Sequence, residues 1–443
     1  MTKADSRKWH LIVGWVIVLA LLGSILPISP AQAQVAEFSG LPAPGVPVFD
    51  ADLAAFRISP DSARLEIYYR ITNPKLSYIK RDSEFVASYE VTAVLTGRGE
   101  RQFDAVSNRE NYVLPSYEET RRSTGYLINV LTVNVPEGDY EVDVTLNDRI
   151  SGGSHTVTRE IDLRTLGSGE WVIGGPEFFV PGAKAPDRDR YKKDTLAFVP
   201  NVTRSFTGNK TRLAFYLEVY QTAKDPITAV IMDVSQRSPK VELRDTLEID
   251  PSQSTSAIVY TNPLEDFRTG ECLLVLTPVD ADGEQVVERT ERIFFVEWAL
   301  ETLVRNDWEN AVDMLIHIAT KDEMDELRAT PVEQRAEAFE EFWESRDPSP
   351  ETQQNEWREE YYRRIRFANQ QFSSAFRPGW RTDFGTVYIT YGEPDEIERF
   401  PFELGQKPHE IWYYYAQRRQ FLFVDVRGNG EYELQYPYDG VIR

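Results

Sequence analysis

The stretch VPEGDYEVDVTLND, residues 135–148, carries the plainest sign of the fold. Pro136 and Gly138 are turn residues, and apolar and polar side chains alternate from Tyr140 onward. This period of two is that of a β-strand with one buried face. We therefore expect a strand to begin near Tyr140, directly after a tight turn.

The chain around this strand repeats the same alternation. Such segments occur at 64–71 (RLEIYYRI), 84–97 (EFVASYEVTAVLTG) and 155–163 (HTVTREIDL), with no convincing amphipathic helix between them. A Tyr near the start of the penultimate strand, its hydroxyl tied back to upstream backbone, is typical of immunoglobulin-like sandwiches. We expect such a sandwich, with Tyr140 at that corner.

A second copy of the pattern lies further along the chain. Gly270-Glu271-Cys272 stands 132 residues after Gly138-Asp139-Tyr140. Thr290-Glu291-Arg292-Ile293 stands the same distance after Thr158-Arg159-Glu160-Ile161. RLAFYLEV at 212–219 repeats RLEIYYRI at an offset of 148, so the first copy would be longer between these markers. Two tandem sandwiches are therefore predicted.

From Trp298 the period changes from two to about 3.6, the period of an α-helix. One long helix is predicted by five apolar residues at spacings of four, four, three and four: Trp357, Tyr361, Ile365, Ala368 and Phe372. We expect this stripe to belong to a hydrophobic core.

The end of the chain returns to short alternating segments. Four strands are predicted here: TVYITY (386–391), EIWYYYA (410–416), QFLFVDV (420–426) and EYELQY (431–436). Helices followed by a small, mostly antiparallel sheet make an α+β domain.

The N-terminal segment has the three parts of a secretory signal. Lys3, Arg7 and Lys8 are basic, residues 11–26 form an apolar run, and Ala31-Gln32-Ala33 is a small-residue cleavage site. We expect export to the periplasm or beyond the cell, with cleavage after Ala33 and no membrane span afterwards. The alternative is a retained anchor, since the apolar run approaches bilayer length.

The composition limits the partners, metals and cofactors that we expect this chain to bind. The 443 residues carry a formal charge of −22, which disfavours nucleic acid and anionic membranes as partners. Apart from His10 in the signal, the histidines are His155, His317 and His409, far apart, and Cys272 is the single cysteine. The sequence also lacks a phosphate-binding loop, a nucleophile elbow and an EF-hand loop. No metal and no cofactor are expected.

These patterns predict a mainly β protein with a C-terminal α+β domain. The predicted divisions are a signal peptide (1–33), a linker (34–48), a first immunoglobulin-like sandwich (49–165), a linker (166–189), a second sandwich (190–296) and the α+β domain (297–443).

Three segments of the last domain resemble the GWxTD-domain proteins, a group of bacterial exported proteins. They are FWESRDPSPETQQNEWREEYYRRIRFANQQF (342–372), GWRTDFGTVYITYGEPDEI (379–397) and IWYYYAQRRQFLFVDVRGNGEYEL (411–434). The resemblance implies bacterial export, a signal peptide and β domains before the signature domain. The signature is Gly379, Trp380, Thr382 and Asp383, with Arg381 at the variable position. Its companions are Arg346-Asp347-Pro348, Asn355-Glu356, Glu360-Tyr361-Tyr362, Gly392 and Pro394-Asp395-Glu396.

Each signature residue has a structural use. Gly379 can take a positive φ, Trp380 is an apolar anchor, and Gly385 permits a bend into the expected strand. Thr382 and Asp383 can bond backbone amides in a tight turn. Gly392, Pro394 and Asp395 suit a second turn. We therefore predict a structural corner rather than a catalytic site.

The alternative is a carboxylate-dependent hydrolase or a carbohydrate-binding protein that acts on a glycan. Two carboxylates could flank a cleft, with Trp380, Tyr388, Tyr391 and Trp412 stacking on sugar rings. The candidate carboxylates are Asp383, Glu393, Asp395, Glu396 and Glu398, with Asp347, Glu356 and Glu360 on the preceding helical segments. The sequence does not show that any two carboxylates face each other. We favour a non-catalytic binding or scaffolding role in the bacterial cell envelope, with a protein or polysaccharide partner.

Overall fold

The computed structural model describes residues 41, 46–97, 101–122, 125–184, 190–193, 196–208, 212–221, 225–236, 241–264, 266–298, 300–348, 350, 355–373, 377–400, 407–428 and 430–435. The predicted signal peptide and its cleavage site lie outside these residues. Within the described part of the chain, the helices are too short or too polar to traverse a bilayer.

The first sandwich has two antiparallel sheets. One runs in the order β1-β2-β6, with β1 (Asp50–Ser59), β2 (Ser62–Thr72) and β6 (Tyr126–Pro136). The other runs β5-β4-β7-β8. The short β3 pairs with the same edge of β4 as β7 does, nearer the start of β4. Its bounds are β3 (Ile79–Arg81), β4 (Glu84–Gly97), β5 (Arg101–Leu114), β7 (Asp139–Asp148) and β8 (Ser154–Asp162). Two short helices, η1 (Asn73–Lys75) and α1 (Tyr117–Arg121), lie at one end.

The expected corner is present at the start of β7. The Tyr140 hydroxyl donates to the Pro136 carbonyl oxygen at 3.2 Å, and the Tyr140 side chain is buried. The alternation in β2 also holds, because Leu65, Ile67 and Tyr69 are fully buried between the two sheets. The prediction of a tyrosine corner is confirmed.

The second sandwich repeats this arrangement. One sheet runs β16-β13-β9, with β9 (Ile173–Phe178), β13 (Arg212–Tyr220) and β16 (Thr255–Pro263). The other runs β12-β18-β17-β14-β15, with β12 parallel to β18. Its bounds are β12 (Ser205–Gly208), β14 (Ala229–Gln236), β15 (Val241–Glu248), β17 (Gly270–Val279) and β18 (Thr290–Trp298). The paired markers found in the sequence occupy matching positions: β2 and β13, β7 and β17, β8 and β18.

One predicted boundary needs correction. Residues 166–189, assigned to a linker, contain β9, and β9 pairs with β13. The segment IGGPEF that forms β9 has two glycines and a proline, so it lacks the alternation by which a strand is recognised in sequence.

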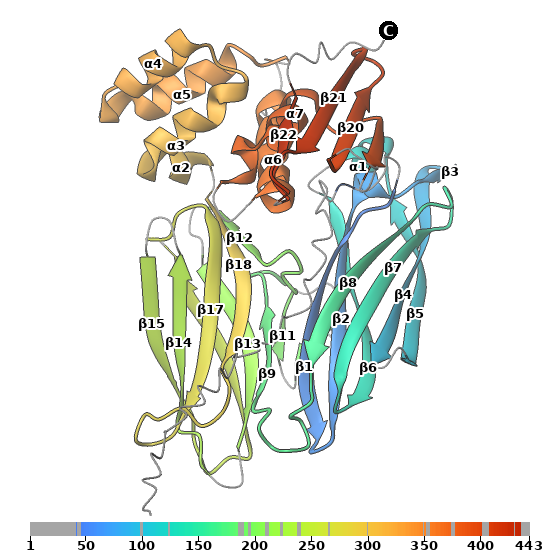
Figure 1. Cartoon of the computed structure of the whole chain (residues 1–443), viewed down its shortest axis with the longest axis vertical. Coiled ribbons are helices and arrows are strands. Elements are labelled where there is room, and N and C mark those ends of the chain that lie inside the picture. The colour runs from blue at the N-terminus through green and yellow to red at the C-terminus, as the bar shows by residue number, and fades with distance from the viewer. Residues whose placement is uncertain are drawn as a thin grey trace, which may run out of the picture.

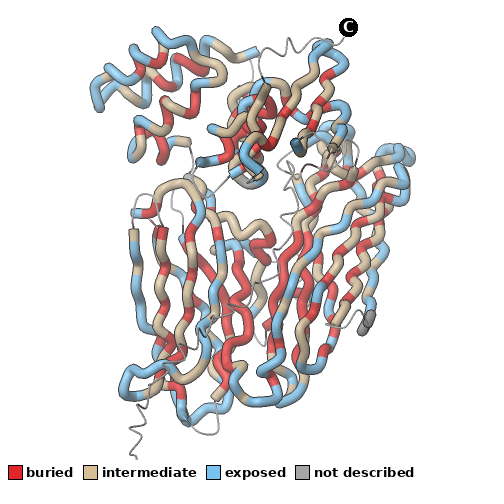
Figure 2. The backbone as a smooth tube through the Cα atoms, in the orientation of Figure 1, coloured by how far each residue is buried: buried red, intermediate tan, exposed pale blue. Residues whose placement is uncertain are grey.

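The sandwiches lie side by side, with β1 next to β9 (Figure 1). Ala54, Phe56 and Tyr68 of the first sandwich belong to the same buried cluster as the core of the second. Buried residues therefore follow both the inner faces of each sandwich and the zone where the two meet (Figure 2). A short hairpin, β10 (Lys192–Lys193) and β11 (Leu196–Ala197), contributes Lys193 to this zone.

The C-terminal domain sits across the ends of both sandwiches (Figure 1). Its helices are α2 (Leu300–Asn306), α3 (Trp308–Asp313), η2 (Met314–His317), α4 (Lys321–Ala329), η3 (Val332–Gln334), α5 (Arg335–Glu344), α6 (Glu356–Phe372), η4 (Gly379–Arg381) and α7 (Asp383–Tyr391). Its antiparallel sheet runs β19-β20-β21-β22, with β19 (Glu396–Phe400), β20 (His409–Tyr414), β21 (Arg419–Asp425) and β22 (Tyr432–Leu434). The α+β prediction is confirmed.

One predicted strand is wrong. TVYITY lies in α7, and the fourth strand of the sheet is β19 instead. The β-branched and aromatic residues of α7 favour a strand by propensity, but packing against α6 and a cap at Thr382 stabilise a helix.

Candidate functional site

The signature residues form the junction at which η4 crosses α6 and leads into α7. A Cβ on Gly379 would lie 1.8 Å from the Ala368 carbonyl oxygen, and one on Gly385 would lie 1.9 Å from the Gly379 carbonyl oxygen. Both glycines therefore allow backbone to touch backbone. The expectation of a positive φ at Gly379 is wrong, since its backbone is not in that region. The glycine is needed for close approach.

The other residues of the junction bond to neighbouring backbone. Thr382 Oγ1 accepts from the Gly385 amide at 3.1 Å and caps α7. Asp383 Oδ2 accepts from the Leu434 amide at 2.7 Å, which fastens β22 to the start of α7. Trp380 is buried, and its carbonyl oxygen lies 3.0 Å from His317 Nε2.

The second signature turn closes α7 against the sheet. Gly392 has a φ of 87°, and its amide donates to the Tyr388 carbonyl oxygen at 2.8 Å. The Gly392 carbonyl oxygen accepts from the Tyr414 hydroxyl at 2.8 Å. Asp395 Oδ2 accepts from the Tyr415 amide at 2.7 Å, and Pro394 is buried. Both turns hold α7 between α6 and the sheet.

Charged groups beside the junction are paired with one another. Glu360 binds Arg363 at 2.6 Å and Arg364 at 2.7 Å, and Arg364 also donates to the Ile389 carbonyl oxygen at 3.0 Å near the end of α7. Burial raises the pKa of Glu360, but hydrogen bonds from Arg363 and Arg364 outweigh it and leave the pKa below its ordinary value. A carboxylate held in this way is unsuited to proton transfer near neutral pH.

Two of the carboxylates considered for a hydrolase, Asp383 and Glu393, are separated by the length of α7. Asp383 begins α7 and Glu393 follows its end, and a nine-residue helix is about 13 Å long. Glycosidase carboxyl pairs stand about 5 to 10 Å apart. Glu393 instead binds Lys75 of the first sandwich at 2.9 Å.

The aromatic residues considered for sugar stacking are largely unavailable. Trp380, Tyr388 and Trp412 are 3, 2 and 0% exposed and belong to the core of the domain. Across the described ranges, no three His, Cys, Asp or Glu side chains come close enough to hold a metal ion.

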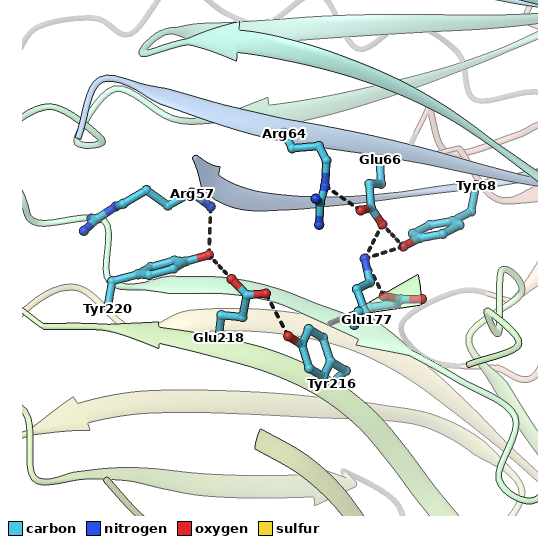
Figure 3. A network of polar contacts seen from close by, with 9 residues as sticks. Arg57, Arg64, Glu66, Tyr68, Glu177, Tyr216, Glu218 and Tyr220 are labelled. Carbon is cyan, nitrogen blue, oxygen red and sulfur yellow. Dashed lines mark hydrogen bonds and ion pairs between the residues drawn. The ribbon is translucent and has the colours of Figure 1, made fainter. Parts of the chain in front are cut away.

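A second polar cluster, which the sequence analysis missed, lies between the sandwiches (Figure 3). Lys193 Nζ is 3.1 Å from Glu177 Oε2 and 3.2 Å from the Tyr68 hydroxyl, and it also forms an ion pair with Glu66. The Tyr68 hydroxyl donates to Glu66. We call Glu66, Tyr68, Glu177 and Lys193 the interface cluster.

A tyrosine-lined carboxylate lies beside the interface cluster. Glu218 accepts from the hydroxyls of Tyr216 and Tyr220, both at 2.7 Å, and the Tyr220 hydroxyl accepts from the Arg57 amide at 2.7 Å (Figure 3). The available sequence signal was an aromatic residue on the outer face of both repeated strands, Tyr68 in β2 and Tyr216 in β13. An aromatic residue on a face expected to meet water can mark a contact surface.

Comparison with known protein families gives a match in the C-terminal domain. Residues 303–438 match the family model described as GWxTD domain. This chain carries a GWxTD domain. The match contains the whole signature, from η4 to the turn before β19, and it leaves both sandwiches outside.

Other comparisons are weak. No curated protein matches this chain. Among solved structures, a protein described as a β-galactosidase from Bacteroides fragilis is 10% identical, with a TM-score of 0.18, covering 37% of this chain and 20% of its own. Red sea bream transglutaminase is 10% identical, with a TM-score of 0.17, covering 56% and 32%. This chain therefore aligns with less than a third of the length of either protein. At these TM-scores neither similarity supports an inference about this chain.

Proposed function

We propose that this GWxTD-domain protein is an exported, non-catalytic binding or scaffolding protein of the bacterial cell envelope. One observation carries the proposal: the polar groups of the signature bond to the domain's own backbone, so the motif is used to build the domain. A group that already holds a helix start or a strand in place is poorly placed to act on a substrate.

Contacts between the domains support a rigid frame. Arg204 of the second sandwich pairs with Asp52 of the first. Lys75 of the first sandwich binds Glu393 of the GWxTD domain, and Arg268 of the second donates to the Asn306 carbonyl oxygen at 2.5 Å. Each pair of domains is thus connected directly, which suits a protein that presents a surface at a fixed orientation.

The outer face of the GWxTD sheet is the surface that we propose for recognition. Its inner face is filled by Trp412, Tyr414 and Phe423, which are buried against α6 and α7. On the outer face the rings of Tyr413 and Tyr415 are stacked, with centroids 6.1 Å apart, and Tyr415 is 52% exposed. Exposed, rigid aromatic rings are favourable contacts for both proteins and sugars.

Affinity capture from envelope fractions tests this proposal. The tagged mature protein is expected to recover a reproducible partner, and the double variant Tyr413→Ser/Tyr415→Ser is expected to recover at least tenfold less. Tyr117→Ser is the matched control, because Tyr117 is 62% exposed on the first sandwich. Equal recovery by the double variant and the control would exclude the outer face of the sheet as the binding surface.

A further inference from the structure

The interface cluster brings together two carboxyl groups and one ammonium group from three strands (Figure 3). Glu66 lies on β2, Glu177 on β9 and Lys193 on β10. Their side chains are 10, 3 and 2% exposed. Burial of charge is costly unless each charge is well paired, so the pairing decides which groups can stay ionised.

The two carboxyl groups differ in the number of partners that stabilise their negative charge. Glu66 lies 2.8 Å from Arg64 Nε, receives the Tyr68 hydroxyl proton and shares Lys193. Glu177 Oε2 lies 3.1 Å from Lys193 Nζ, and Tyr68 also favours the charged form of Glu177, but Glu177 has no counterpart to the Arg64 partner of Glu66 among the described residues. Glu177 is therefore the less stabilised anion of the two.

The surroundings of Glu177 favour its neutral form. Glu66 and Tyr68 face it from β2, Lys193 from β10 and Tyr216 from β13. Burial raises the pKa of Glu177 to about 7, against the attraction of Lys193 and with a contribution from the negative charge of Glu66. Burial and the neighbouring carboxyl groups of Glu177 and Glu66 also raise the pKa of Tyr68, which keeps its hydroxyl protonated as a donor.

We propose that the interface cluster is a proton-operated latch, in which Glu177 takes up a proton when the two sandwiches dock. The first sandwich supplies Glu66 and Tyr68, and the segment that leads into the second supplies Glu177 and Lys193, so the cluster exists only when both are together. With the Glu177 carboxyl neutral, Glu66 is the one anion of the cluster, and both Arg64 and Lys193 pair with it. With that carboxyl charged, two buried anions lie beside Lys193, because Arg64 pairs with Glu66 and leaves Glu177 to the shared ammonium group.

The direction of the pH response follows from the two states of Glu177. In undocked sandwiches its pKa returns towards the ordinary 4.5, below the docked value. Docking therefore binds a proton: the added stability is present in full below pH 4.5, decreases above that pH and is lost as pH rises through about 7. Between pH 6 and pH 8 the docking equilibrium is expected to weaken about tenfold.

Thiol labelling of the full chain carrying Ala54→Cys tests the latch. Ala54 is fully buried and pairs with Glu66 across β1 and β2, so the introduced thiol reacts only when the interface opens. Its labelling rate, divided by that of a free thiol at the same pH, is expected to rise about tenfold from pH 6 to pH 8. Cys272, 1% exposed in the core of the second sandwich, reports in the same sample that the sandwich stays folded.

Two further variants isolate Glu177. Adding Glu177→Gln, which keeps the shape but stays neutral, is expected to abolish the rise. Adding Glu218→Gln, in the neighbouring tyrosine-lined site, is expected to retain it. A rise of the same size with Glu177→Gln, or no rise in the protein that keeps Glu177, would overturn the proposal.

Discussion

Gly379 illustrates how a single residue can define the GWxTD domain. Its backbone lies directly on α6, and the space for a Cβ is already occupied by the Ala368 carbonyl group. Gly385, in the first turn of α7, meets the Gly379 carbonyl group in the same way. The two glycines stack α6, η4 and α7 at backbone contact distance, and Thr382 between them caps the helix that results.

Gly379→Ala is expected to destabilise the GWxTD domain by about 3 kcal/mol, because two backbone segments must move apart to admit a methyl group. Chemical denaturation of the purified protein measures the loss. Gly97→Ala is the matched control, since nothing lies within 4 Å of the Cβ that it would add. Equal stability of both variants would mean that the junction is looser than described.

At the scale of elements, the sequence predicts best where one period runs without interruption. The long β-strands and the stripe on α6 are found as expected, and Tyr361, Ile365 and Ala368 are buried. The strand predicted at 386–391 fails because local propensity and tertiary packing disagree there. The signature residues were recognised, but the contact of Gly379 with α6 is between distant segments and could not be inferred from spacing.

The two sandwiches close the same corner with different residues. In the first, Gly138 leaves room for the ring of Tyr140, whose hydroxyl bonds to Pro136. In the second, Cys272 takes the tyrosine position and cannot reach the turn. The Gln236 side chain replaces it: its amide donates to the Arg268 carbonyl oxygen at 2.8 Å and accepts from the Arg268 amide at 2.9 Å.

Gln236→Ala is expected to cost about 2 kcal/mol of stability, because it leaves both backbone groups of Arg268 without this partner. Tyr140→Phe removes one hydrogen bond and keeps the buried ring, so about 1 kcal/mol is expected. Urea denaturation of the two variants provides the comparison. A larger loss for Tyr140→Phe would show that the glutamine does not perform the role of the tyrosine corner.

At the scale of the molecule, the main unexpected feature is how the sandwiches meet. Alternation in β2 assigns Glu66 and Tyr68 to a solvent-facing surface, yet both are buried against the second sandwich. Alternation reports on one sheet at a time and cannot distinguish a face that meets water from a face that meets another domain. The resulting interface joins the two sandwiches, and together with the contacts of each sandwich to the GWxTD domain it forms the frame on which the proposed binding role depends.

A distance measurement between the sandwiches tests this frame most directly. Spin labels on Tyr117→Cys and Val259→Cys occupy exposed sites of the first and second sandwich, while the native Cys272 is buried and escapes labelling. At pH 6 the account predicts one narrow peak in the distance distribution measured by double electron-electron resonance. A broad distribution would contradict it, because the sandwiches would then move independently and could not present the GWxTD domain at a fixed orientation.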